Sequence, residues 1–187
     1  IKENYYAKGV SPFIKQTFDN NTINGEPWSK YAAGYMWGVT GIIYNPEYVT
    51  KQEASTWKII NNDKFRRKIT VKDNVRDTMF AAIGAIKSDK LRSQDFTKQA
   101  DYTDKLAEVM NDTSKDTVDE VLEYLQQVKD NVYSFETDSG KIDAITGKIS
   151  AGYQWSGDAV YIMQQAEAND VELNFTIPEE CTNMYFD

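Results

Sequence analysis

The chain has 187 residues and a mass of 21.4 kDa, enough for one well-buried core, and its 41% hydrophobic content is typical of a globular protein. Its formal net charge of −8 argues against nucleic acid or an anionic membrane as partner, since each requires a concentrated basic face, and favours a cationic ligand. The absence of histidine and the single Cys181 exclude a Ser-His-Asp constellation, a cysteine metal cluster and an internal disulfide. We therefore expect no cofactor, no metal and no enzymatic activity.

The first part of the chain predicts short elements around one buried strand. Residues 1–33 are a mixed lead-in, because prolines, glycines and paired asparagines interrupt any long helix. The expected elements are a short helix over residues 13–18, a buried strand over residues 35–44, a short helix from the capping pair Thr50 and Glu53 through Trp57, and a strand over residues 68–72.

The rest of the chain alternates helices and strands. Asp73 is a good N-cap for a helix to about Lys87, whose expected apolar face is Val75, Met79, Ala82, Ile83 and Ile86. Further helices are expected over residues 102–110, from the capping pair Thr117 and Glu120 through Val128, and over residues 141–146 and 156–168; strands are expected over residues 132–135, 149–155 and 171–177.

This alternation predicts an α/β fold. Strands separated by helices and short turns form a three-layer sandwich, with helices on both faces of a largely parallel sheet. No repeat or linker divides the sequence. We expect a single lobe over residues 1–187, in which residues 34–187 form the body and residues 1–33 lead into it.

Two carboxylates stand at the start of the helix that follows the strand over residues 68–72. Asp73 and Asp77 are four residues apart and share one face of the first helical turn, where the helix dipole stabilises ionised carboxylates by about 0.3 to 1 kcal/mol. The alternative is that Asp73 only caps the helix, while Asp77 faces water or pairs with Arg76 or Lys72.

Aromatic side chains complete the candidate site. Trp155 ends one predicted strand, Trp37 lies in another, and Tyr185 and Asp187 stand at the end of the sequence; each could also be an ordinary packing or surface residue. Aromatic faces and carboxylates in one cleft suit an elongated organic polycation, because ammonium groups require charged acceptors and a methylene stem requires flat apolar walls.

These residues occur in an ordered set that resembles the spermidine/putrescine-binding proteins of polyamine ABC transporters. The resemblance covers about residues 31 to 187 and rests on residues 35–45, Trp57, and residues 72–77, 153–159, 177–180 and 185–187. Members of that family have two α/β lobes of the type II periplasmic-binding-protein fold, with a ligand enclosed between them. The resemblance implies that this chain is the second lobe, a fragment of a longer two-lobe protein.

The resemblance assigns the family's ligand contacts to Asn74, Asp77, Trp155, Tyr185 and Asp187. This sequence departs from the family's pattern at three of them. Asn74 stands where the family often has an acid, Asp77 where glutamate is common, and Tyr185 where tryptophan is usual. Which polyamine fits is therefore left open, and Asp73 is a cap first and a ligand second.

The resemblance also implies partners and a location. The partners are spermidine or putrescine, the permease subunits of an ABC importer, and the missing first lobe; the protein is expected to be an extracytoplasmic monomer, held at the membrane by a lipid anchor or by fusion to its permease. Two alternatives stay open: a binding lobe for another small cation, and a sensor or interaction module on the same fold.

Overall fold

The computed structural model describes residues 9–187, and these divide into two compact units. The larger unit is Val39–Asn183; the smaller one ends at Gly38 and also includes Met184–Asp187. The sequence placed the start of the lobe at residue 34 and treated the last residues as part of it. Each unit is described by itself below.

The larger unit is built on a mixed sheet with the strand order β5-β4-β6-β3-β7. The strands are β3 (Trp37–Tyr44), β4 (Ile69–Lys72), β5 (Ser134–Glu136), β6 (Ala151–Trp155) and β7 (Asn174–Thr176). β4 is parallel to β5 and β6, whereas β3 is antiparallel to both β6 and β7. Four strands therefore point the same way and β3 runs against them, which confirms the prediction of a largely parallel sheet.

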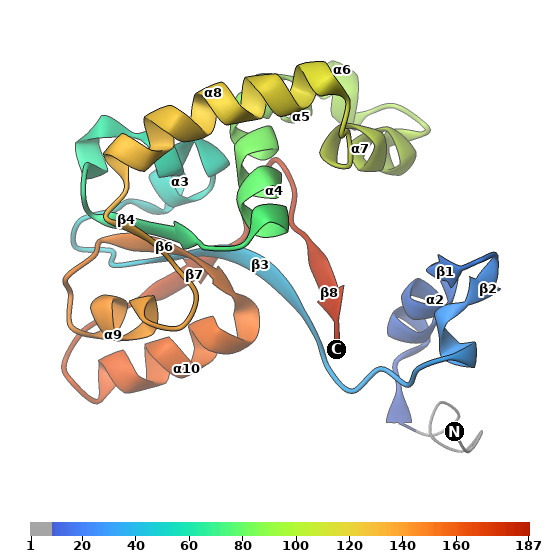
Figure 1. Cartoon of the computed structure of the whole chain (residues 1–187). Helices are drawn as coiled ribbons and strands as arrows, with labels where there is room; N and C mark the ends of the chain where they lie inside the picture. The colour runs from blue at the N-terminus through green and yellow to red at the C-terminus, as the bar shows by residue number, and fades with distance from the viewer. Residues whose placement is uncertain (1–8) are drawn as a thin grey trace. The chain divides into compact units, whose positions relative to one another are not determined.

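Helices cover both faces of this sheet, as predicted (Figure 1). On one face lie α3 (Lys51–Ala54), α4 (Val75–Ile86) and α8 (Lys115–Asn131), and on the other lie α9 (Gly140–Ile145) and α10 (Ser156–Glu167). In β3, Ile42 packs with Trp57 in one core cluster, while the next residue, Ile43, packs with Ile162 in the other. Because successive side chains of a strand point to opposite faces, a continuous apolar run fills both layers.

A third cluster lies beyond the sheet, around the short helices between α4 and α8. These helices are α5 (Ser88–Leu91), α6 (Gln94–Thr97) and α7 (Tyr102–Met110), and the connection from α3 to β4 adds the 3-10 turns η2 (Trp57–Asn61) and η3 (Asp63–Phe65). Leu91, Phe96 and Met110 pack against Ile83 of α4 and Val121 of α8. The predicted helix over residues 102–110 is confirmed.

Two helix starts differ from the prediction. Asn74, not Asp73, is the N-cap of α4, and its side chain accepts hydrogen bonds from the backbone N–H groups of Arg76 and Asp77. Ser114, not Thr117, caps α8. Asparagine caps a helix as well as aspartate does, and serine caps it at least as well as threonine does. The residue types alone therefore did not select the cap of either helix. The capping box at Thr50 is confirmed.

The burial of α4 differs in part from its expected apolar face, and α8 exposes some of its apolar side chains. Val75 is 83% exposed, and Val118 and Leu122 of α8 are 43% and 57% exposed. Once Asn74 is the cap, Val75 becomes the first helical residue. The predicted Ala82 and Ile83 are buried, and the buried face of α4 also carries Thr78, Ala81 and Ala85.

The smaller unit consists of α2 (Pro12–Asn20), a two-stranded hairpin of β1 (Thr22–Ile23) and β2 (Glu26–Pro27), the turn η1 (Trp28–Lys30), and β8 (Met184–Phe186), which pairs with β3. α2 confirms the predicted short helix, whereas the hairpin and β8 were not predicted. Phe18 is the buried hydrophobic residue among the described residues of this unit, with edge-to-face contacts to Trp28 and Phe186 at 5.6 Å each.

Candidate functional site

The carboxyl ends of β4 and β6 bring predicted site residues together in the larger unit. β4 ends at Lys72, just before α4, and β6 ends at Trp155, just before α10. The two strands are parallel neighbours, so both strand-to-helix connections lie at one edge of the sheet, where open α/β sheets bind ligands. Asp77 lies in the first turn of α4 and is 8% exposed.

Lys72 occupies the centre of this edge and has no exposed surface. Its ammonium group donates to Oε1 of Gln154 at 2.7 Å and to the backbone oxygen of Thr137 at 3.2 Å, and it lies 4.1 Å from the ring centre of Trp155. The sequence suggested Lys72 only as a possible ion-pair partner of Asp77. A lysine inside a buried strand is the signal that could have marked it, because lysine is almost never fully buried without a partner.

The charged groups at this edge are poorly solvated, and each of them shifts the pKa of its neighbours. Burial raises the pKa of Asp77, while the Lys72 ammonium and the indole N–H of Trp155 act in the opposite direction. Burial lowers the pKa of Lys72, and the carboxylates of Glu136, Asp158 and Asp77 oppose that change. Asp77 is thus a desolvated carboxylate, for which a cation is the favourable neighbour.

Glu136 is the second buried carboxylate here and was not predicted. It accepts from the backbone N–H of Gly140, and Nε2 of Gln154 lies 3.5 Å from it. A Cβ added at Gly140 would lie 2.0 Å from the Glu136 carboxylate, so this close approach requires glycine. Burial raises the pKa of Glu136. Gln154 therefore links Glu136 to Lys72.

Asp158 of α10 has its own cation. Lys141 of α9 lies 2.9 Å from the Asp158 carboxylate and 3.1 Å from that of Asp138. The Asp158 side chain is 25% exposed and that of Lys141 is 23% exposed. This ion pair is more exposed than Lys72, and its two charges compensate each other.

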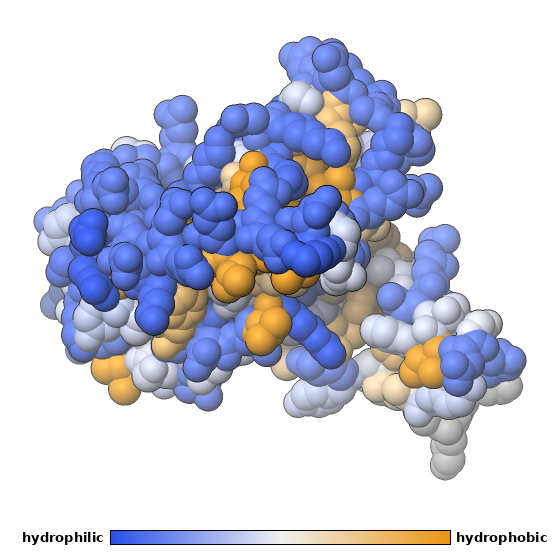
Figure 2. All heavy atoms as spheres, turned by 45° about the horizontal axis from the view of Figure 1, so that its top comes forward, coloured by the Kyte–Doolittle hydropathy of each residue, from blue (hydrophilic) through white to orange (hydrophobic). Residues whose placement is uncertain are grey.

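Asn74 and Asp73 have different surroundings from Asp77. The amide oxygen of Asn74 accepts from two backbone N–H groups, at 3.0 Å and 3.2 Å, so its acceptor capacity is used at the helix start. Asp73 is exposed. Both residues line a hollow of about 360 Å³ whose other walls are mainly apolar, among them Val75, Leu122 and Leu125. Figure 2 shows hydrophobic residues open to solvent between hydrophilic ones on the α8 side.

The remaining predicted residues belong to the smaller unit. Trp37 is 48% exposed, Tyr185 is half-buried and Asp187 is exposed. The backbone of Asp187 pairs with that of Met36, with hydrogen bonds of 3.0 Å and 2.8 Å. This pairing places Asp187 beside the start of β3.

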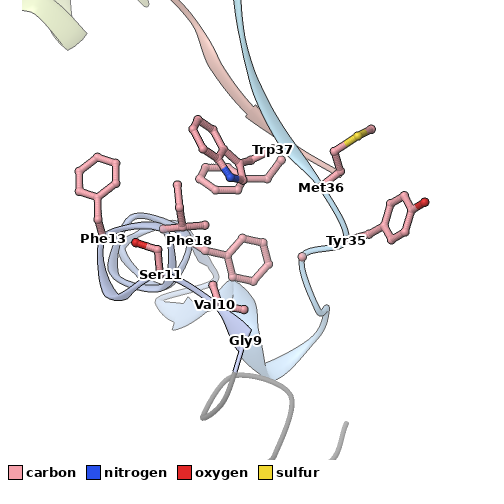
Figure 3. A pocket seen from close by; sticks show the side chains of 11 residues that line it. Gly9, Val10, Ser11, Phe13, Phe18, Tyr35, Met36 and Trp37 are labelled. Atoms are coloured by element: carbon pink, nitrogen blue, oxygen red, sulfur yellow. The ribbon is translucent and has the colours of Figure 1, made fainter. Parts of the chain in front are cut away.

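Trp37 also lines a hollow of about 360 Å³ in the smaller unit, together with Phe13, Phe18 and Phe186. In Figure 3, Trp37 lies on the side of α2, whereas Tyr35 and Met36 project away from that helix. Among the described residues that line this hollow, none has a carboxylate side chain. Its walls are mainly flat and apolar.

Two further observations concern the described residues. Between residues 9 and 187, no group of three or more acidic or cysteine side chains is arranged to hold a metal ion. In the same range, no helix combines the length and apolar character needed to cross a membrane.

Comparison with known proteins shows which family this chain resembles. The model of the family "Bacterial extracellular solute-binding protein" matches residues 2–186. The spermidine/putrescine-binding periplasmic protein 1 of Haemophilus influenzae is 21% identical over 159 residues, which are 85% of this chain and 38% of that protein.

Two solved structures are similar in fold. The spermidine/putrescine ABC transporter substrate-binding protein PotD from Streptococcus pneumoniae has a TM-score of 0.69 at 21% identity, with 95% of this chain and 46% of that one covered. The TpPotD lipoprotein of Treponema pallidum has a TM-score of 0.59 at 15% identity, with 83% and 44% covered. The chain thus spans less than half the length of each of these relatives.

The fold is that of one lobe of a periplasmic-type binding protein. The match over nearly the whole sequence establishes the family. The chain belongs to the bacterial extracellular solute-binding proteins.

Proposed function

We propose that this chain is the second lobe of the substrate-binding component of an ABC importer for polyamines, with spermidine or putrescine as ligand. The observation that carries the proposal is the buried carboxylate of Asp77 beside the indole of Trp155, at the ligand-binding edge of the sheet. The names of relatives in Haemophilus influenzae and Streptococcus pneumoniae support the same ligand class.

The chemistry of the site suits an alkyl ammonium group. A desolvated carboxylate gains most from a cation that donates hydrogen bonds to it, and an aromatic ring accepts the adjoining methylene groups. In this proposal Asp77 accepts the ammonium group and Trp155 packs on the stem. Trp37, Tyr185 and Asp187 are proposed as further ligand contacts, as the resemblance implies, with Asn74 and Asp73 contributing at the rim.

The proposal also includes a further lobe in the same polypeptide. The aligned part of this chain covers less than half of each relative, 38%, 46% and 44%. The smaller unit also exposes large apolar side chains, among them Tyr35 at 84%, Phe13 at 62% and Tyr31 at 60%, which a further lobe could cover. Closure of two lobes over the ligand and docking of the closed form on a permease follow from this arrangement.

The location is proposed from the family and from one relative. The family is described as extracellular, and the Treponema pallidum relative is a lipoprotein. We propose an extracytoplasmic monomer that is attached to the membrane by a lipid anchor or by fusion to the permease.

The affinity of this lobe alone follows from the number of contacts. Micromolar binding corresponds to about −8 kcal/mol. Hydrogen bonds to charged groups contribute about 1.5 to 3 kcal/mol each, against association costs of at least about 4 kcal/mol. Two such contacts do not reach micromolar affinity, so the 187-residue chain is expected to bind polyamines only weakly. Submicromolar binding of spermidine to this piece in calorimetry would contradict the proposal of a two-lobe site.

The test of ligand class uses the polypeptide with both lobes. Calorimetric competition among spermidine, putrescine and thiamine should show displacement by the two polyamines and none by thiamine. Preferential binding of thiamine would instead support a lobe for another small cation. A sensor or interaction module is favoured if the double variant Asp77→Ala/Asp187→Ala leaves ligand binding unchanged.

A further inference from the structure

Lys72 places an ammonium group of the protein inside the cluster where a ligand ammonium is proposed to bind. Its three N–H groups have three acceptors: Gln154, the backbone oxygen of Thr137 and the face of Trp155. Lys72 is therefore saturated, so it contributes its charge to the site without a free donor for the ligand.

The charges that surround Lys72 divide into two groups. Asp158 pairs with Lys141 and is compensated there. Asp77 and Glu136, both more than 90% buried, share the single positive charge of Lys72. Asp73 and Arg76 at the helix start are exposed, and solvent screens them. Two buried carboxylates and one buried ammonium leave a single net negative charge.

We propose that Lys72 is a specificity-determining residue: its ammonium takes the place of one ligand amine, so that the buried edge where β4 and β6 end accepts one ammonium group, at Asp77. The inference rests on the proposed function, since it presupposes an amine ligand. It predicts that this edge favours amines of lower charge, because a second ligand ammonium near Trp155 would meet the positive charge of Lys72 without a further buried carboxylate to accept it.

The experiment measures the ratio of the dissociation constants of spermidine and putrescine, which carry three and two amines. Calorimetry is performed on the polypeptide with both lobes, as wild type and as Lys72→Gln, Glu136→Gln and Lys68→Gln. Lys68 is the matched control, because it lies just before the same strand, is exposed, and its substitution removes the same charge. Circular dichroism in the near ultraviolet establishes that each variant is folded.

Lys72→Gln should strengthen spermidine binding relative to putrescine by about tenfold, because the net charge of the buried cluster becomes more negative by one unit. Glu136→Gln, which keeps an acceptor for the Gly140 N–H, should move the ratio in the opposite direction. Lys68→Gln should leave the ratio within about twofold. If Lys72→Gln or Glu136→Gln does not fold, the ratio measured for the other variant tests the inference.

A ratio that stays within about twofold in the folded buried variants, or that moves in the same direction in both, would overturn the inference while the proposed function stands. Absence of any amine binding to the wild type would overturn the proposed function and this inference together. The wild-type titration is therefore performed first and separates the two failures.

Discussion

The ammonium nitrogen of Lys72 lies 4.1 Å from the ring centre of Trp155, at the edge of the sheet where β4 and β6 end. One face of the tryptophan thus already carries a cation that belongs to the protein. The charge of Lys72 and the indole N–H of Trp155 both lower the pKa of Asp77, against the larger effect of burial. Lysine, tryptophan and carboxylate thus lie together at this edge, and the proposed ligand would bind next to them.

The first prediction concerns Asp77. Asp77→Asn should weaken polyamine binding to the polypeptide with both lobes by about 10- to 100-fold, because it removes a charged acceptor worth about 1.5 to 3 kcal/mol. Asp116→Asn is the matched control, since Asp116 is an exposed carboxylate in the first turn of a different helix, α8. Equal losses in the two variants by calorimetry would contradict the assignment of Asp77 as the ammonium acceptor.

The same substitution should stabilise the fold at neutral pH. Burial raises the pKa of Asp77 in the folded state. Between the unfolded pKa of about 3.9 and this raised value, the folded state binds more protons, so the contribution of Asp77 to stability falls as the pH rises. Asp77→Asn removes that cost. Urea unfolding should therefore show a more stable variant at pH 7 and a vanishing difference below about pH 3.5.

The second prediction separates the two residues at the start of α4. Asn74→Ala should lower the free energy of unfolding by about 0.5 to 2 kcal/mol, because two backbone N–H groups lose their side-chain acceptor. Asp73→Ala should change it by less than about 0.5 kcal/mol, as expected for an exposed position. Urea unfolding measures both, and a larger effect of Asp73→Ala would argue against Asn74 as the cap.

The third prediction compares two adjacent glutamates. Glu180 has no exposed surface, and its carboxylate accepts from the hydroxyl groups of Thr56 and Ser88, each at 2.5 Å, and from the backbone N–H of Trp57. Glu180→Ala leaves these donors unpaired and should cost about 3 kcal/mol or more.

Glu179→Ala supplies the control for this comparison. Glu179 pairs with Arg92 on the surface, and exposed pairs contribute about 0 to 1 kcal/mol. In thermal unfolding, the melting temperature of Glu180→Ala should lie far below that of Glu179→Ala. Similar melting temperatures would mean that the buried carboxylate is not required.

The fourth prediction concerns two helical glycines. A Cβ at Gly84 would lie 2.5 Å from Cδ1 of Trp57, whereas a Cβ at Gly157 meets nothing within 4 Å. Gly84→Ala should therefore destabilise by about 1 to 3 kcal/mol through overpacking. Gly157→Ala should stabilise by about 0.4 to 1 kcal/mol, because alanine restricts the unfolded chain. The denaturant midpoint should fall for Gly84→Ala and rise for Gly157→Ala. A lower midpoint for both variants would contradict the open space at Gly157.

The amino-acid sequence by itself determined the layers of the fold. Local periodicity, which depends on neighbours in the sequence, predicted the buried strands, the helices on both faces and the amphipathic helix over residues 102–110. It also predicted a helix from Thr117 through Val128, which the structure shows over residues 115–131. The strand-to-helix turn after β4 and the tryptophan at the end of β6 were identified for the same reason. The sequence pattern also sufficed for the family, which the comparison confirms.

Only the tertiary structure decided which charged groups share the buried edge. Lys72, Glu136 and Gln154 are 18 to 82 residues apart along the chain, and their contacts depend on the parallel register of β4 with β5 and β6. Sequence spacing carries no information on such pairings. The cap of α4 also had to be seen, since Asp73 and Asn74 are both good capping residues and only the backbone at Asn74 selects between them. The site that began as two acids on one helical turn is, in three dimensions, one buried carboxylate beside a lysine and a tryptophan.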